Sequence, residues 1–516
     1  MFGKNGRLHP AVWVLIAISA GAALFFTFFG ITNSLWLDES YSVHVSTQGF
    51  QGIINELHHD THPPLYYLLL AGWIRLFGIS EAAVRGFSGL FYLCDVVAVY
   101  YLARTVYDRE TGLLCSFLYM ISPLSTATAQ LTRMYSLLAF LSMLSMLLFF
   151  RLFVRGEKSR TMAALYVLVN VLGTFTHLWF FFLLTSHVLA CALLLPRART
   201  VALLKLLALS VIPYAVLWGP ILLEQVRVNA TSWLARPGLK EFALGLLGFF
   251  GLKVALVAYP LFLLLVLFRI RGRRIVRQSL AEIKAFVAER RSLVFLIFLG
   301  VALVLPFLIS QIKPIFGPNR YTIIALPAFS VLLAAVLIRF ADKRLLVGCC
   351  FLLLAGIGVA FAKHQSASQF CTDKNLTGYV VEHAGDGDLL VFNSLSRTTT
   401  DYYLRLMNPQ KRFAEMTYPA ELDQHVGWRN VEQMLRRRVE LEREADEAIA
   451  WIKSQVADGR KRVWLFYLDD EISDILKRRL DANLSKVDEI GAACDEQRDE
   501  YKLFYRRILV YQGLPK

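Results

Sequence analysis

The stretch HHDTHPPLYYLLLAGWIRLFG, residues 58–78, decides how this chain is arranged in space. It begins with a polar cluster, passes through two prolines and continues as an apolar run from residue 63 to residue 78. If that run crossed a membrane completely, every later basic loop would lie on the wrong side, because Lys and Arg mark the cytoplasmic side. The sequence therefore predicts an interfacial or re-entrant helix here.

The composition on either side of this stretch is that of a membrane protein. Of 516 residues, 56% are apolar and only 18% are charged, with a mean hydropathy of +0.49, which leaves too little charge for an ordinary soluble surface. Apolar runs of about 20 residues, enough to span a bilayer, recur from residue 11 to residue 362. The net charge of +15 is concentrated in short loops, so the positive-inside bias explains it and nucleic-acid binding is disfavoured.

The basic loops determine the number of crossings. They lie at 4–7, 104–109, 151–160, 197–205, 269–291 and 339–344. Placing all of them on one side requires an even number of crossings between consecutive loops. We predict eleven spans with the N-terminus inside and the C-terminus outside, at 11–31, 82–103, 111–128, 132–150, 161–177, 178–195, 203–223, 251–268, 293–312, 321–339 and 345–362.

Residues 363–516 form a second predicted domain, of soluble α/β type, beyond the membrane domain at 1–362. Strands are expected at 387–393, 461–469 and 501–511, and helices at 432–457 and 470–483. We find no phosphate-loop or dinucleotide fingerprint, so no nucleotide cofactor is expected. Cys371 and Cys494 are the only cysteines of this domain, and an outer location would permit a disulfide between them.

Two polar groups stand out in the outer loop at 32–81. Asp38 and Glu39 follow the first span directly, where acids either face water or serve a function. The HHDTH cluster then places His59, Asp60 and His62 just before the prolines. Imidazoles and a carboxylate at this spacing can bind a divalent metal or, when protonated, a phosphate, whereas the plainer interpretation is a hydrated loop before a proline-initiated helix.

More polar groups are predicted at the same membrane depth. They are Arg133, Tyr135, His177, Lys253, Arg320 and Tyr321. Each alone is typical of an interfacial anchor, but together they would form a cationic collar. Asp95 differs from them because it lies midway along a predicted span, where an acid is costly unless it is paired or protonated.

Several of these motifs, taken in order, resemble the GT-C superfamily of membrane glycosyltransferases. They are the Asp38–Glu39 pair, the HPPLYY run with Tyr66, the RMY stretch at 133–135 and the RY…P pattern at 320–327. The similarity is greatest to the branch that contains protein O-mannosyltransferases, lipid A aminoarabinose transferases and rhizobial galacturonosyltransferases. Its specific motifs cover residues 36–152. Relatives often carry an acid two residues before the arginine, where this chain has Leu131.

The resemblance implies a transferase that moves a sugar from a polyprenyl phosphate donor to a lipid, polysaccharide or protein acceptor, at the periplasmic face of a bacterial inner membrane. It implies that Asp38 is the catalytic carboxylate and that His62 contributes to the carrier phosphate or metal site. Displacement opposite the phosphate would invert the anomeric centre, with Asp38 as general base. The charge of the released phosphate would be stabilised either by Arg320, Lys253, Arg133 and protonated His62 or by a metal held by His62 and His177. The alternative is a lipid or solute transporter, which would concentrate its ionisable residues near the midplane.

Overall fold

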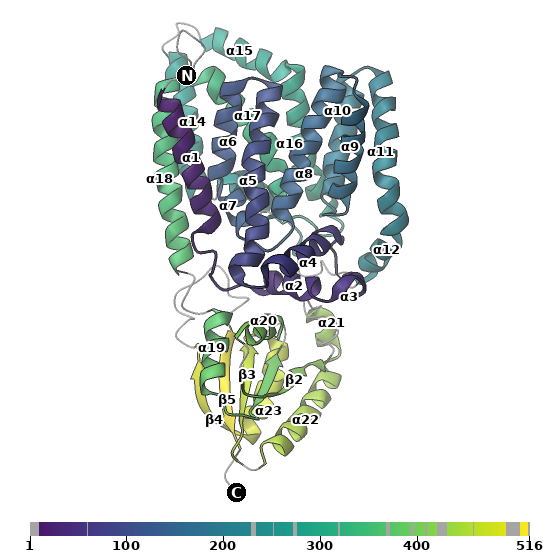
Figure 1. Cartoon of the computed structure of the whole chain (residues 1–516), viewed down its shortest axis with the longest axis vertical. Coiled ribbons are helices and arrows are strands. Elements are labelled where there is room, and N and C mark those ends of the chain that lie inside the picture. Colours follow the sequence, from purple (N-terminus) through teal and green to yellow (C-terminus); the bar gives the residue numbers. More distant parts are fainter. Residues whose placement is uncertain are drawn as a thin grey trace.

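The computed structural model describes residues 10–58, 60–228, 234–250, 252–271, 276–317, 320–367, 372–393, 397–407, 410–420, 431–457, 459–491 and 506–513. Figure 1 shows a bundle of long helices with a small α/β domain at one end. Three short helices of the first outer loop lie between the two parts. The protein is therefore mainly helical, and its two parts meet at the predicted outer loop.

Every predicted span coincides with a helix of the bundle. These helices are α1 (Pro10–Phe28), α5 (Glu81–Val106), α6 (Arg109–Ile121) with α7 (Pro123–Ala129), α8 (Tyr135–Phe149) continued by η1 (Phe150–Arg155), α9 (Arg160–Thr174), α10 (Phe180–Leu194), α11 (Arg197–Leu217), α14 (Leu252–Arg271), α16 (Arg290–Ile309), α17 (Leu326–Phe340) and α18 (Lys343–Ala367). Within the described ranges, six helices are long and apolar enough to cross a membrane, or seven if α6 and α7, bent by 64°, form one span. The total of eleven spans and their orientation stay predictions.

The apolar run at 63–78 forms a single helix, α4 (Leu65–Phe77), of 13 residues. At 1.5 Å per residue such a helix is about 20 Å long, less than the ~30 Å of a hydrocarbon core. Together with α2 (Leu37–Ser46) and α3 (Gly49–Leu57), it gathers at the end of the bundle nearest the α/β domain (Figure 1). This arrangement agrees with an interfacial helix rather than a crossing.

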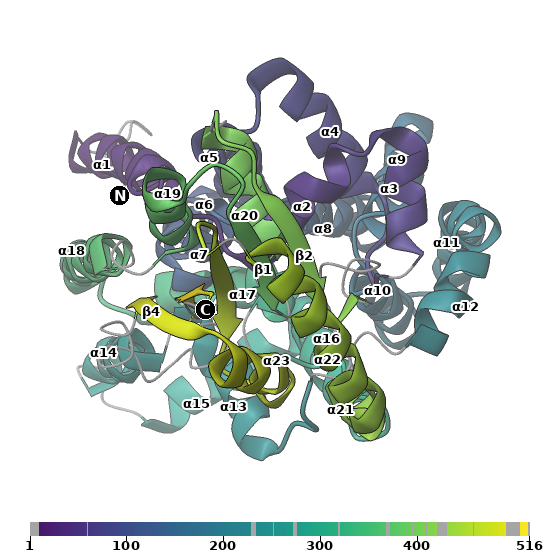
Figure 2. The ribbon, with the colours of Figure 1, turned by 90° about the horizontal axis from the view of Figure 1, so that it is seen from below.

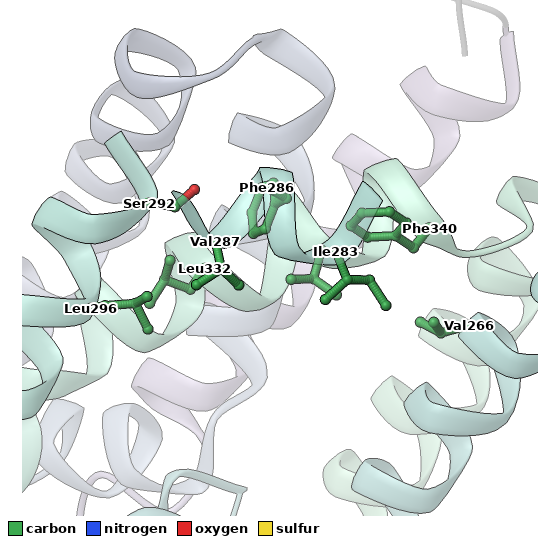
Figure 3. Close-up of a pocket in the computed structure, with 9 residues that line it drawn as sticks. Val266, Ile283, Phe286, Val287, Ser292, Leu296, Leu332 and Phe340 are labelled. Atoms are coloured by element: carbon green, nitrogen blue, oxygen red, sulfur yellow. The ribbon is translucent and has the colours of Figure 1, made fainter. Parts of the chain in front are cut away.

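The outer connection expected at 224–250 is also helical in part. It contains the end of α12 (Gly219–Val228), α13 (Leu239–Leu247) and a short 3-10 turn, η2 (Gly248–Phe250). At the far end of the bundle, α15 (Val276–Ala288) packs against α14, α16 and α17. These four helices enclose an apolar cavity of about 170 Å³ (Figure 3), which none of the predicted site residues lines.

The C-terminal domain is built on one five-stranded sheet with the order β2-β1-β3-β5-β4. The strands are β1 (Leu389–Asn393), β2 (Ala414–Tyr418), β3 (Arg462–Leu468), β4 (Ser485–Ile490) and β5 (Arg506–Gln512). β1 pairs in parallel with β2 and β3, whereas β5 pairs antiparallel with β3 and β4. The helices are α19 (Asp373–His383), α20 (Arg397–Met407), α21 (Val431–Arg436), α22 (Arg438–Gln455) and α23 (Glu471–Asn483).

Only the inner strands of this sheet are predictable from apolar runs in the sequence. β1, β3 and β5 are apolar because both faces are covered, by Leu376 and Val380 of α19 on one side and by residues of α22 and α23 on the other. The edge strands β2 and β4 are short and largely polar, so their pattern resembles that of a loop. The single helix expected at 432–457 is two, α21 and α22, separated at Arg437. Residues 501–505, Cys371 and Cys494 lie outside the described residues.

Candidate active site

The two adjacent acids of α2 point in different directions, as expected for neighbours ~100° apart on a helix. Glu39 is buried, with only 1% of its surface exposed. Its carboxylate accepts hydrogen bonds from Arg85 Nε at 2.9 Å and Arg85 Nη2 at 2.7 Å, and from the backbone N–H of Thr132 at 3.0 Å. Arg85 also donates to backbone carbonyls at residues 31, 33 and 34. Glu39 therefore joins α2 to α5 and to the segment that precedes α8.

The Asp38 side chain points away from the Glu39–Arg85 pair and remains partly exposed to solvent. Its Oδ2 lies 2.7 Å from Arg320 Nη1, and the two side chains are 21% and 23% exposed, respectively. Arg320 begins the 3-10 turn η3 (Arg320–Ala325), which continues into α17. Its guanidinium lies over the rings of Trp36, Tyr135 and Tyr321 at 5.0, 5.9 and 5.8 Å. A partly exposed acid is thus paired with a cation held on aromatic faces.

Behind this pair, Arg133 forms a second, buried centre of positive charge. Arg133 Nη2 lies 3.2 Å from His62 Nε2, and its Nη1 lies 3.3 Å from the Tyr67 hydroxyl and 3.4 Å from the Asp38 carbonyl. His62 Nδ1 lies 3.0 Å from Asp60 Oδ2. Because Arg133 can only donate, His62 Nε2 must accept and Nδ1 must carry the proton given to Asp60. Arg133 therefore places a buried positive charge directly beside the His62 ring.

His177 lies near residues of both groups, the Asp38–Arg320 pair with its aromatic rings and the Arg133–His62 contact. It lies in the turn between α9 and α10, with its ring centroid 5.7 Å from His62, 6.0 Å from Tyr135 and 6.1 Å from Tyr321. Burial lowers the pKa of His177 well below its ordinary value, and the positive charges of Arg133 and Arg320 lower it further. The Tyr135 hydroxyl is buried and has no hydrogen-bond partner within the described part of the chain. Imidazole and phenol groups thus line the inner side of the Asp38–Arg320 pair.

Most of the predicted site residues come together here, although they originate from five separate segments. Tyr66 is different, because it packs against α5 with its hydroxyl 3.4 Å from Ser88 Oγ. The backbone of Lys253 lies in α14, but its side chain and all of His59 lie outside the described residues. Sequence reasoning missed Arg85, whose signal was a lone arginine in the first turns of an otherwise apolar span.

The surroundings of the two histidines predicted as metal ligands disfavour a divalent ion. His62 Nε2 faces the Arg133 guanidinium, which would repel a metal, and His177 Nδ1 accepts the backbone N–H of Trp179 at 3.1 Å. Over the residues that the structure describes, no group of three or more His, Cys, Asp or Glu side chains could hold a metal ion. The Arg133 guanidinium beside His62 disfavours a metal at this position, and the pairing of His62 and His177 as ligands stays a prediction.

Asp95, the acid within α5, takes part in helix packing. It is buried and accepts a hydrogen bond from the Tyr119 hydroxyl of α6 at 3.0 Å. Such a bond between neighbouring helices satisfies one carboxylate oxygen where water is absent. Asp95 is therefore paired with Tyr119 between two helices and is not part of the Asp38 site.

The chain is similar to a known protein family and to several solved structures. Residues 61–223 match the family described as dolichyl-phosphate-mannose-protein mannosyltransferase. Among solved structures, ArnT from Cupriavidus metallidurans in the apo state aligns over 98% of this chain and 100% of its own, with a TM-score of 0.62 and 14% identity. The same protein bound to undecaprenyl phosphate aligns over the same shares, with a TM-score of 0.59 and 13% identity.

A more distant likeness is to the oligosaccharyltransferase AglB from Archaeoglobus fulgidus in complex with an inhibitory peptide and a dolichol-phosphate. It has 12% identity and a TM-score of 0.47 over 88% of this chain and 69% of that one. No curated protein sequence matches the chain. The fold is that of ArnT, and the resemblance expected from the sequence is confirmed at the level of the fold.

Proposed function

We propose that this protein is a membrane glycosyltransferase that moves a sugar from a polyprenyl phosphate carrier to an acceptor hydroxyl. The observation that carries the proposal is the 2.7 Å pair of Asp38 and Arg320, partly exposed at the outer-loop end of the bundle. It is supported by the family match, whose description names a dolichyl phosphate sugar, and by the ArnT structure that holds undecaprenyl phosphate.

The chemistry of a phosphate-linked donor suits these residues. Breaking the bond between the anomeric carbon and the carrier oxygen releases a phosphate monoester, whose second pKa is ~6. Such a leaving group needs positive charge rather than a proton, and Arg320 offers it at the surface of the site, with Arg133 buried behind. The acceptor oxygen forms the new bond to the anomeric carbon and loses its proton to the Asp38 carboxylate.

Arg320 would change its partner during this reaction. Before the donor binds, its guanidinium neutralises Asp38. An arriving carrier phosphate competes with Asp38 for the same guanidinium, because arginine binds phosphate and carboxylate in the same bidentate manner. The Asp38 carboxylate is then free to take the acceptor proton. Attack from the face opposite the phosphate inverts the anomeric centre.

The finer features of the proposal are the location and the acceptor. We infer that the site faces the periplasm of a bacterial inner membrane, since the basic loops lie at the other ends of the spans. The C-terminal domain lies on the same side as the site (Figure 1). The acceptor is a hydroxyl of a lipid, glycan or protein that reaches the outer loop from that side.

The test is sugar transfer in liposomes that contain the purified protein. We would supply undecaprenyl phosphate sugars, each labelled in the sugar, with an envelope extract from cells that lack the protein as acceptor. The wild type should move label from one donor into the extract. Asp38→Asn should lose transfer by about 100-fold to 10,000-fold, and Arg320→Gln should raise the donor KM.

A matched control is Glu157→Gln. Glu157 and Arg151 form a pair of the same length, 2.7 Å, with comparable side-chain exposures of 30% and 37%. Arg151 lies in η1 and Glu157 in the link from η1 to α9, away from the outer loop. This variant should transfer sugar at the wild-type rate. Normal transfer by Asp38→Asn, or no transfer by the wild type from any donor of the panel, would refute the proposed function.

A further inference from the structure

The C-terminal domain contacts α2 of the outer loop through α20. Figure 2, seen from the side of this domain, places α20 beside α2. Ser40 Oγ of α2 and Thr399 Oγ1 of α20 lie 2.8 Å apart, and both residues are fully buried. Ser40 stands two positions after Asp38. The two domains thus share a hydrogen bond within one turn of the proposed base.

A second bond from α20 fixes the chain where it enters α2. The backbone N–H of Leu35 donates to the Tyr403 hydroxyl at 2.7 Å, and both residues are buried. The next residue, Trp36, precedes the first turn of α2 and carries the ring over which Arg320 lies. Tyr403 therefore holds the backbone on the other side of Asp38 from Ser40.

Helix α2 needs such support because it is short. It has 10 residues, and isolated helices below ~12–15 residues are marginal in water. Its direction must therefore come from tertiary contacts. Glu39 anchors its inner side through Arg85, and α20 covers a further side through Thr399 and Tyr403. A displacement of about 1 Å at a reacting group can reduce the rate about 100-fold, so these anchors bear directly on the position of Asp38.

We propose that α20 positions the catalytic carboxylate, with Thr399 and Tyr403 as positioning residues that act through Ser40 and Leu35. The inference rests on the proposed function, since it assigns these two residues a role in the same transfer. It also gives the C-terminal domain a purpose in catalysis: the domain completes the support of the outer loop.

Other contacts keep the domain in place independently of these two residues. The Tyr402 hydroxyl donates to the Ile79 carbonyl at 2.7 Å, just before α5, and Lys374 of α19 pairs with Glu81 at 2.7 Å. Loss of one hydroxyl from Thr399 should therefore leave the domain docked. Tyr402→Phe is the matched control, because it removes a hydroxyl from the neighbouring residue of the same interface without touching α2.

The experiment compares Thr399→Val, Thr399→Ser, Tyr403→Phe and Tyr402→Phe in the liposome assay, with kcat and donor KM determined separately. We expect Thr399→Val and Tyr403→Phe to lower kcat about 10-fold to 100-fold with donor KM within about twofold of the wild type. Thr399→Ser keeps the hydroxyl and should restore most of the rate. Tyr402→Phe should resemble the wild type. An equal loss in Tyr402→Phe, or a normal kcat in Thr399→Val, would overturn the inference.

A second measurement needs no donor and separates this inference from the proposed function. Amide hydrogen exchange of the peptide that covers residues 37–46 reports the local opening of α2. Exchange there should be faster in Thr399→Val than in Tyr402→Phe or the wild type, while the bundle helices exchange as before. Unchanged exchange in α2 would overturn the positioning role even if the enzyme acted on none of the donors tested. A wild type without transfer but with this exchange pattern would instead overturn the proposed function alone.

Discussion

Asp38 and Glu39 are neighbours in the sequence, and we predict that their substitution impairs the protein in opposite ways. Glu39→Gln should mainly reduce stability. Glu39 and Arg85 are 1% and 6% exposed and share two hydrogen bonds, at 2.9 and 2.7 Å. Removing one charge from a buried pair leaves the other uncompensated, which costs about 3–5 kcal/mol. The retained amide oxygen of Gln places the expected loss near the lower end of that range.

Asp38→Asn should leave stability almost unchanged and remove activity. The Asp38–Arg320 pair is more than one-fifth exposed on both sides, and exposed pairs contribute about 0–1 kcal/mol to stability. As the proposed base, however, Asp38 should account for about 100-fold to 10,000-fold in rate. One variant is thus expected to be unstable and the other inactive but well folded.

The measurement is thermal unfolding in detergent at one fixed scan rate, combined with initial transfer rates at a temperature where both variants are folded. Glu39→Gln should unfold well below the wild type, whereas Asp38→Asn should unfold with it. The double variant Glu39→Gln, Arg85→Met removes both charges and should recover part of the lost stability, because no uncompensated charge is then left in the interior. If Glu39→Gln unfolded like the wild type yet lost transfer, Glu39 would have a direct chemical role and the reasoning would fail.

Three further outcomes are expected. The pKa of His177 is lowered in the folded state, so below pH ~6.5 the unfolded chain binds a proton that the folded protein does not. As the pH decreases through this range, the free energy of unfolding should decrease by up to ~1.4 kcal/mol per pH unit. Thermal scans at pH 7.5 and 5.5 should therefore show a smaller decrease in unfolding temperature for His177→Gln than for the wild type. Because Arg133 stands where a metal bound to His62 would lie, exhaustive chelation should leave the transfer rate within about twofold, and a loss restored by added metal would contradict this. Asp95→Asn keeps an oxygen that can accept from the Tyr119 hydroxyl, so this variant should transfer sugar at the wild-type rate. A large loss of sugar transfer would instead favour a transport role for Asp95.

The rule that an even number of crossings separates consecutive basic loops predicted much of the helical architecture correctly, at the level of segments. The turn that it required between the spans 161–177 and 178–195 lies between α9 and α10, and the turn that it required between the spans 111–128 and 132–150 lies between α7 and α8. These features were predictable because basic residues at span ends and apolar length are local properties of the sequence. The edge strands of the C-terminal sheet were not, since β2 and β4 lack the apolar alternation that marks a half-buried strand.

The site was predictable as a set of residues but not as a set of partners. The chemistry of Asp38, His62, Arg133 and Arg320 follows from residue type and from the outer loops that carry them. Which acid pairs with which arginine depends on the rotation of each helix about its own axis within the bundle. A single sequence does not specify that rotation. The contact between Arg133 and His62, which disfavours a metal there, likewise arises only from packing.

The bond between Ser40 and Thr399 joins residues separated by 359 positions, and this has a consequence for biogenesis. The outer loop is synthesised early, yet its covering helix emerges only after the last bundle helix, α18. Until then α2 has neither Thr399 nor Tyr403 beside it, so a ribosome-bound chain that has completed the bundle would still hold an unfinished loop. Maturation of the nascent protein should therefore end with a late docking step, which a stalled-translation series extended past residue 403 could time through protection of the loop from protease.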